Sequence, residues 1–147
     1  MDMTENEKKK EFLNSYLRAK QDVLRLEEQL EELRESKMSL SMANDGMPHG
    51  SSKRDLSDYA AKVDELERKI TAKRYQRIQT FQNVQNAIED MEDSQEKLLL
   101  TYRYIKGMKW EEIAVQMNYS WQHTHKIHAN ALQNFKHAIE CDIVPMV

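Results

Sequence analysis

Apolar residues near the start of the chain are spaced alternately by four and three positions. They are Phe12, Tyr16, Ala19, Val23, Leu26, Leu30 and Leu33. This heptad spacing places them in one narrow stripe along an α-helix, and most of the positions between them are charged or polar. A helix with such a stripe is marginal by itself and has to bury it against another helix. The pattern therefore predicts a long helix that packs in a coiled coil.

A second segment with the same spacing follows a short stretch rich in turn formers. This stretch, from about 41 to 52, contains Gly46, Pro48 and Gly50 and is expected to be a loop. The spacing resumes at Leu56, Tyr59, Val63, Leu66 and Ile70. It then shifts by one residue, as a stutter would produce, at Ile78, Phe81, Val84, Ile88 and Met91. Two such helices are expected to fold back as an antiparallel hairpin over residues 1–91.

The hairpin leaves its partners open. Its two stripes can cover each other, or they can join those of further copies in a homodimer or higher oligomer. Basic residues also cluster on the second helix, at Arg68, Lys69, Lys73, Arg74 and Arg77. In a register centred near residue 47, this cluster is expected to face the region of Arg18, Lys20 and Arg25 rather than the acidic residues at 27–35. Such a basic belt is usually a solvated face, and contact with DNA or an acidic partner is the alternative.

Glycine and proline are scarce, which limits the fold classes and the binding motifs that this chain can form. The 147 residues include 3 glycines and 2 prolines, too few for the frequent turns of strand-rich folds, so an all-α protein is predicted. Neither glycine-rich phosphate-binding motif can be written with these glycines. Scattered carboxylates and the lack of a nucleophile–base set favour a protein that is not an enzyme, with no catalytic residues and no cofactor.

The cysteine, the histidines and the apolar runs indicate the cellular location of the protein and whether it binds a metal. One cysteine, Cys141, and no apolar run of about 18 residues predict a cytoplasmic protein without membrane contact. His123, His125 and His128 do not form a zinc ligand set, so no metal is expected. His128 is expected to pack beside Thr124, and the other two histidines to lie on the surface or face DNA.

A second domain is predicted from about residue 92 to 147. Asp93 and Glu96 have the spacing of a capping box, which opens a helix from Gln95 to Ile105 that ends at Gly107. Residues 97–139 hold six basic and two acidic side chains, a net charge of +4 within a chain whose total is −3. This local excess is typical of a surface that binds nucleic acid.

The residues from Trp110 to Ile127 fit a helix-turn-helix. Counted from Trp110, Ala114 stands where the two helices cross closely, and Asn118 stands where the turn needs a positive φ. Ser120 is placed to cap the second helix, expected over 120–140. The core face of that helix is expected to contain Thr124, Ile127, Ala131, Phe135 and Ile139.

The opposite face of this helix supplies candidate contacts to double-stranded DNA. Side-chain amides of Gln122 and Asn130 match adenine, whereas Lys126 can meet guanine or phosphate. Trp121 can pack on a sugar or a thymine methyl group. Lys109 and Arg103 precede the helices, where the phosphate backbone would pass, although Arg103 could instead pair with Glu112. The candidate DNA-binding residues are Arg103, Lys109, Ser120, Trp121, Gln122, His123, His125, Lys126 and Asn130.

Several of these residues also carry a family resemblance. The runs Glu96–Leu100, Arg103–Gly107 and Trp110–Ala114, with Ser120 and Ile127–His128, resemble the fourth region of bacterial sigma factors. The chain resembles ArpU/RinA-like regulators of phages of low-GC Gram-positive bacteria still more closely. This resemblance implies a phage or prophage transcriptional regulator, active in the bacterial cytoplasm, that reads a promoter element and contacts RNA polymerase. The alternatives are a phage DNA-packaging subunit and a polymerase-binding adaptor that does not contact DNA.

Overall fold

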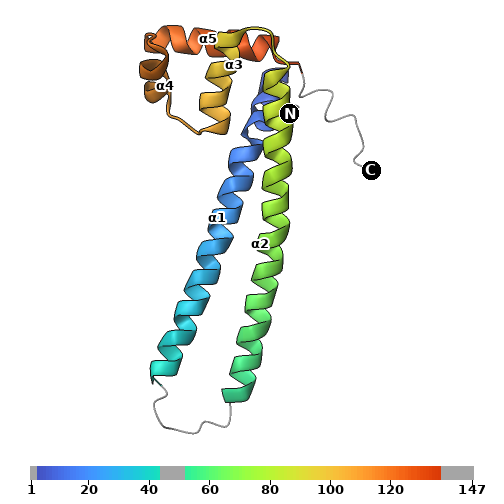
Figure 1. Ribbon diagram of the computed structural model, residues 1–147, viewed down its shortest axis with the longest axis vertical. Helices are drawn as coiled ribbons and strands as arrows, with labels where there is room; N and C mark the ends of the chain where they lie inside the picture. The colour runs from blue at the N-terminus through green and yellow to red at the C-terminus, as the bar shows by residue number, and fades with distance from the viewer. Residues whose placement is uncertain (1–2, 44–51, 137–147) are drawn as a thin grey trace, which may run out of the picture. The chain divides into compact units, whose positions relative to one another are not determined.

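The computed structural model describes residues 3–43 and 52–136, and every regular element in these ranges is helical. Two long helices, α1 (Glu5–Ala43) and α2 (Ser52–Glu89), pack antiparallel (Figure 1). Three shorter helices follow, α3 (Ser94–Leu100), α4 (Trp110–Met117) and α5 (Trp121–Asn134), with a π-helical turn, η1 (Thr101–Ile105), directly after α3. The all-α prediction and the antiparallel hairpin are confirmed.

The chain divides into two compact units. The hairpin unit is Ala19–Arg77, and the terminal unit combines Met1–Arg18 with Ile78–Val147. The first turns of α1 and the last turns of α2 therefore belong to the same unit as the short helices. The boundary near residue 92 stays a prediction, but residues on both sides of it share one core in the terminal unit.

The hairpin unit is held by part of the predicted apolar stripe. Leu26, Leu30 and Ile70 form a buried cluster, with Val63 and Leu66 packed against it. Leu56 is exposed and does not join the stripe as predicted. The loop expected from about 41 also begins later, because α1 continues to Ala43; residues 44–51 lie outside the described residues.

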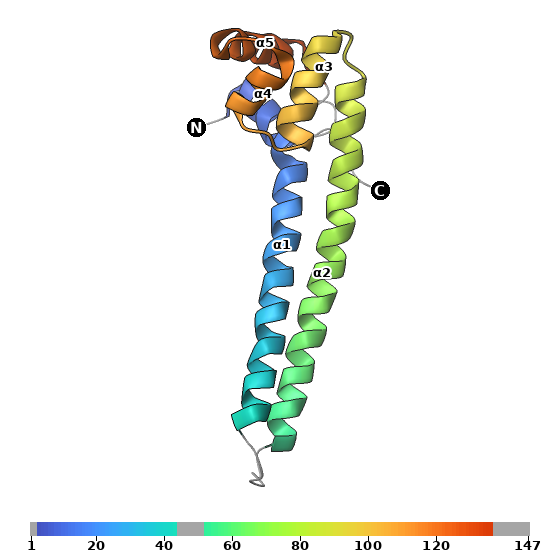
Figure 2. The ribbon, with the colours of Figure 1, turned by 60° about the vertical axis from the view of Figure 1, so that its left-hand side comes forward.

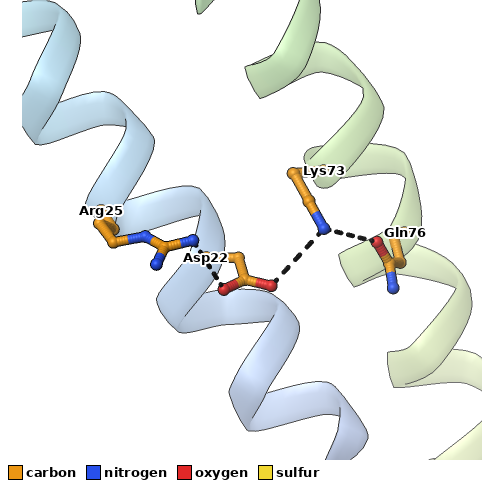
Figure 3. Close-up of polar contacts among 4 residues, drawn as sticks. All are labelled: Asp22, Arg25, Lys73 and Gln76. Atoms are coloured by element: carbon orange, nitrogen blue, oxygen red, sulfur yellow. Dashed lines mark hydrogen bonds and ion pairs between the residues drawn. The ribbon is translucent and has the colours of Figure 1, made fainter.

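The basic belt predicted for the hairpin unit is wrong. Arg74 donates to a Glu27 carboxylate oxygen at 3.0 Å, and Arg34 pairs with Glu67 at the same distance. The ammonium group of Lys73 lies 3.7 Å from an Asp22 carboxylate oxygen (Figure 3). Lys73 and Arg74 of the basic cluster therefore face acidic residues of α1 rather than a second basic patch. Arg68 and Lys69 pair with Asp64 and Glu65 of their own helix.

The core of the terminal unit draws on all its helices. Leu13 of α1, together with Val84 and Ile88 of α2, is buried against Leu99 of α3 and Ile113 of α4. The aromatic ring of Phe135, directly after α5, is also fully buried in this core.

Two positions depart from the predicted stripe in this unit. Leu13 is fully buried although it lies one position beyond the narrow stripe, because this end of α1 packs against the short helices as well as against α2. Ile78, where the shifted spacing was expected to begin, is 53% exposed. The buried residues of α2 in this core start only at Val84.

The role of α1 in this core can be measured by substitution. Leu13→Ala is expected to lower the free energy of unfolding by about 2–5 kcal/mol, because it removes a fully buried side chain and leaves a cavity. Leu24→Ala changes an α1 leucine that is 56% exposed and should stay within about 0.5 kcal/mol of the wild type. Urea denaturation monitored by circular dichroism gives both values. Equal losses for the two variants would contradict the assignment of Leu13 to the core.

Candidate nucleic-acid interface

The helix before the helix-turn-helix begins at the predicted cap. The Asp93 carboxylate accepts hydrogen bonds from the backbone N–H groups of Gln95 and Glu96, at 2.9 and 3.0 Å. The Glu96 side chain does not complete a capping box. Its two carboxylate oxygens accept from the Asn134 amide, at 2.9 and 3.2 Å, which ties the start of α3 to the end of α5.

This helix widens before it ends. The sequence predicts one helix from Gln95 to Ile105, whereas α3 passes into the π-helical turn η1 at Thr101. Gly107 then takes a φ of +68°, the left-handed conformation expected at this position. A π-helical turn rotates the residues after it, so the side chains of η1 point differently from those of a continued α-helix.

The turn between α4 and α5 has the predicted geometry. Asn118 adopts φ 61° and ψ 42°, and Tyr119 N–H donates to the Ala114 carbonyl at 2.9 Å, which closes the end of α4. The Ser120 hydroxyl accepts from the His123 backbone N–H at 3.1 Å and caps α5. Ala114 is buried, consistent with a close crossing of the two helices.

The second helix is shorter than predicted. It ends at Asn134, and Phe135 turns to an extended conformation. The range expected for this helix, 120–140, is therefore wrong at its C-terminal end. Ile139, expected on its core face, lies outside the described residues, as does Cys141. Phe135 reaches the core as a capping residue instead of as part of the helix.

Thr124 fits the core of this helix because its hydroxyl has a partner. The side chain is fully buried, and its hydroxyl donates to the Ser120 carbonyl at 2.8 Å. A buried hydroxyl without a partner would be costly. The local hydrogen bond thus explains how threonine stands at an otherwise apolar position.

Seven of the nine candidate DNA-binding residues are exposed. They are Lys109, Ser120, Trp121, Gln122, His123, Lys126 and Asn130. All but Lys109 lie on α5 or cap it. The His123 ring is also in edge contact with Tyr119, with ring centroids 4.7 Å apart. The structure thus leaves a largely polar face of α5 open to solvent.

The two remaining candidates, Arg103 and His125, are half-buried in a stack of planar side chains, which we call the planar column. The Arg103 guanidinium lies over Trp110 at 4.5 Å, and Trp110 and His125 have ring centroids 4.5 Å apart. His125 in turn lies 4.0 Å from Trp121, which is 56% exposed. The column therefore runs from η1 to the first residue of α5.

Arg103 and His125 therefore pack within the terminal unit, whereas the sequence predicts that both contact DNA. Arg103 donates to the Met108 carbonyl at 3.0 Å, and among the described residues it does not pair with Glu112. The Nε2 atom of His125 is buried within the unit. Trp110, which was not among the predicted DNA-binding residues, holds the middle of the column. Its signal in the sequence was an aromatic residue at the first position of α4.

A buried pair lies behind this column. The Tyr104 hydroxyl and Nε2 of His128 are joined by a 2.7 Å hydrogen bond, and His128 also contacts Trp110 edge-on. Burial raises the pKa of Tyr104 to about 12. Burial, with the charges of Lys10, His125 and Arg103, lowers the pKa of His128 to about 4. His128 therefore packs as a neutral ring, against Tyr104 and Trp110.

In the described part of the chain, no group of three or more histidine, cysteine, aspartate or glutamate side chains is placed to hold a metal ion. No helix in the same ranges is long and apolar enough to cross a membrane.

Comparison with known proteins yields no relative. No protein-family model, no curated protein and no solved structure matches this chain. The family named from the sequence resemblance remains an expectation.

The pKa of His128 makes the stability of the protein depend on pH. The unfolded chain binds a proton at this histidine near pH 6.5, whereas the folded chain binds it only near pH 4. The contribution of this histidine to the free energy of unfolding is therefore fully present above pH 6.5 and is lost as the pH drops toward 4. Denaturation at several pH values should show a steeper loss for the wild type than for His128→Gln. Parallel curves for the two proteins would refute the shifted pKa.

Proposed function

We propose that this protein is a sequence-specific regulator that binds double-stranded DNA through α5. The observation that carries the proposal is the geometry of α4, the left-handed Asn118 and the capped α5, whose polar face is exposed. In a helix-turn-helix the second helix enters the major groove and its N-terminal side chains meet base edges.

The exposed side chains suit this role chemically. Gln122 offers a paired donor and acceptor for adenine, and the Lys126 ammonium can contact guanine or phosphate. Lys109 stands directly before α4, where an exposed cation can meet the phosphate backbone. His125 of the planar column packs against Trp121, whose exposed surface lies at the start of α5.

The wider role proposed is transcriptional regulation, in a phage or prophage, with contact to RNA polymerase. This part rests on the sequence resemblance. The hairpin unit would then join copies of the chain or dock on polymerase.

DNA binding can be tested by separating backbone contacts from base contacts. Lys126→Ala is expected to weaken binding to a selected sequence and to random DNA alike, because it removes a cation that meets phosphate. Gln122→Ala should weaken binding mainly to the selected sequence, by about 1–3 kcal/mol. Fluorescence anisotropy with both duplexes measures these losses. The role assignment fails if both variants lose the same affinity for both duplexes.

A second candidate, the polymerase-binding adaptor, is favoured by one observation. Val115 on α4 is 81% exposed. An apolar side chain that is open to solvent on this helix suits contact with a protein surface.

The two candidates differ in what a change at the DNA face would do. If α5 reads DNA, the combined change Trp121→Ala, Gln122→Ala and Lys126→Ala abolishes regulation of a reporter promoter. The triple variant should still capture purified RNA polymerase. Val115→Asp is the matched variant on α4 in the same capture assay. Regulation that survives the triple change would identify the adaptor.

A further inference from the structure

The first turns of α1 lie beside the C-terminal end of α5, as both views show (Figure 2). The ammonium group of Lys9 is buried and donates to the Leu132 carbonyl at 2.8 Å. The rings of Phe12 and Phe135 lie 5.9 Å apart. Leu13 is buried in the same core as Phe135, and Phe12 packs against this core. More than 100 residues of sequence separate the two segments, so no local pattern reveals this arrangement.

The Lys9 contact is favourable for two reasons. Leu132 belongs to the last turn of α5, where carbonyl groups lack partners within the helix. These carbonyls also form the negative end of the helix dipole, which attracts a cation. The bond satisfies the buried ammonium group and fixes the start of α1 against α5, which in turn fixes the position of the next residue, Lys10.

Lys10 is exposed, and it is held near α5 by this packing. It lies between Lys9 and Phe12 in α1, and these two residues contact Leu132 and Phe135 at the C-terminal end of α5. Neighbouring carboxylates on α1 are engaged elsewhere: Glu7 accepts from Thr4 N–H at 2.9 Å, and Glu11 lies 3.9 Å from Arg18. Among the described residues, no carboxylate forms an ion pair with Lys10.

A helix in the major groove has phosphates on both sides, and lysine or arginine side chains can contact them. The groove is about 12 Å wide and a helix with its side chains is about 10–12 Å across, so phosphates run close to its flanks. The sequence of α5 contains one lysine, Lys126, and no arginine. The half of the helix beyond Lys126 therefore has no cation of its own.

We infer that Lys10, from the N-terminal helix α1, contacts a DNA phosphate beside the C-terminal half of α5. The inference rests on the proposed DNA binding. It extends the interface to a residue of the predicted coiled-coil segment. Lys10 acts on affinity for any sequence, since a phosphate contact carries no base information.

The experiment measures how DNA affinity depends on salt. Each phosphate neutralised contributes about 0.9 to the slope of log K against log salt concentration. The wild-type protein is expected to show a slope of about −2.7 to −3.6 on a random duplex, from three or four phosphates. Lys10→Gln should make the slope less steep by about 0.9, and Lys10→Arg should restore it. Melting temperatures of both variants should equal that of the wild type.

The matched control is Lys62→Gln, which removes another exposed lysine, from the hairpin unit, and should leave the slope unchanged. A wild-type protein without salt-dependent DNA binding would overturn the proposed function and this inference together. A wild-type slope as expected, with no change for Lys10→Gln or the same change for Lys62→Gln, would overturn the phosphate contact alone.

Discussion

The terminal unit depends on the burial of the ends of the hairpin against the short helices. Leu13 and Ile88 come from segments that the sequence assigns to a coiled coil, yet they are completely buried with Leu99 and Ile113. Three short helices bury little apolar area, and a small unit gains stability when further helices cover its core. The hairpin ends therefore complete the unit that presents α5.

Polar contacts then fix the two ends of α5. Its N-terminus is capped by Ser120, and its C-terminal turn is held by Lys9 at Leu132 and by Glu96 at Asn134. Buried charged groups are tolerated only when they are hydrogen-bonded, so these contacts restrict how α5 can move. A helix that is fixed at both ends suits the recognition of a regular ligand such as duplex DNA.

Much of the candidate site could be predicted from the sequence because its signals are local. A positive φ suits Asn118, a serine caps a helix, and exposed polar residues follow from helical periodicity. The planar column could not be predicted in this way. Arg103, Trp110 and Trp121 lie on different elements, and only the crossing of those elements stacks them. The π-helical turn likewise had no visible signal in the sequence.

By itself, the sequence determined the all-α class, the two long helices, the turn at Asn118 and the cap at Ser120, since each depends on residues within a few positions of one another. Only the tertiary structure decided how these elements combine. The partners of Leu13 and Lys9, the pairing of Arg74 with Glu27, and the end of α5 at Asn134 all depend on contacts between distant segments. A heptad stripe specifies that a helix must be covered, but which side chains cover it depends on register and on the neighbours that packing supplies.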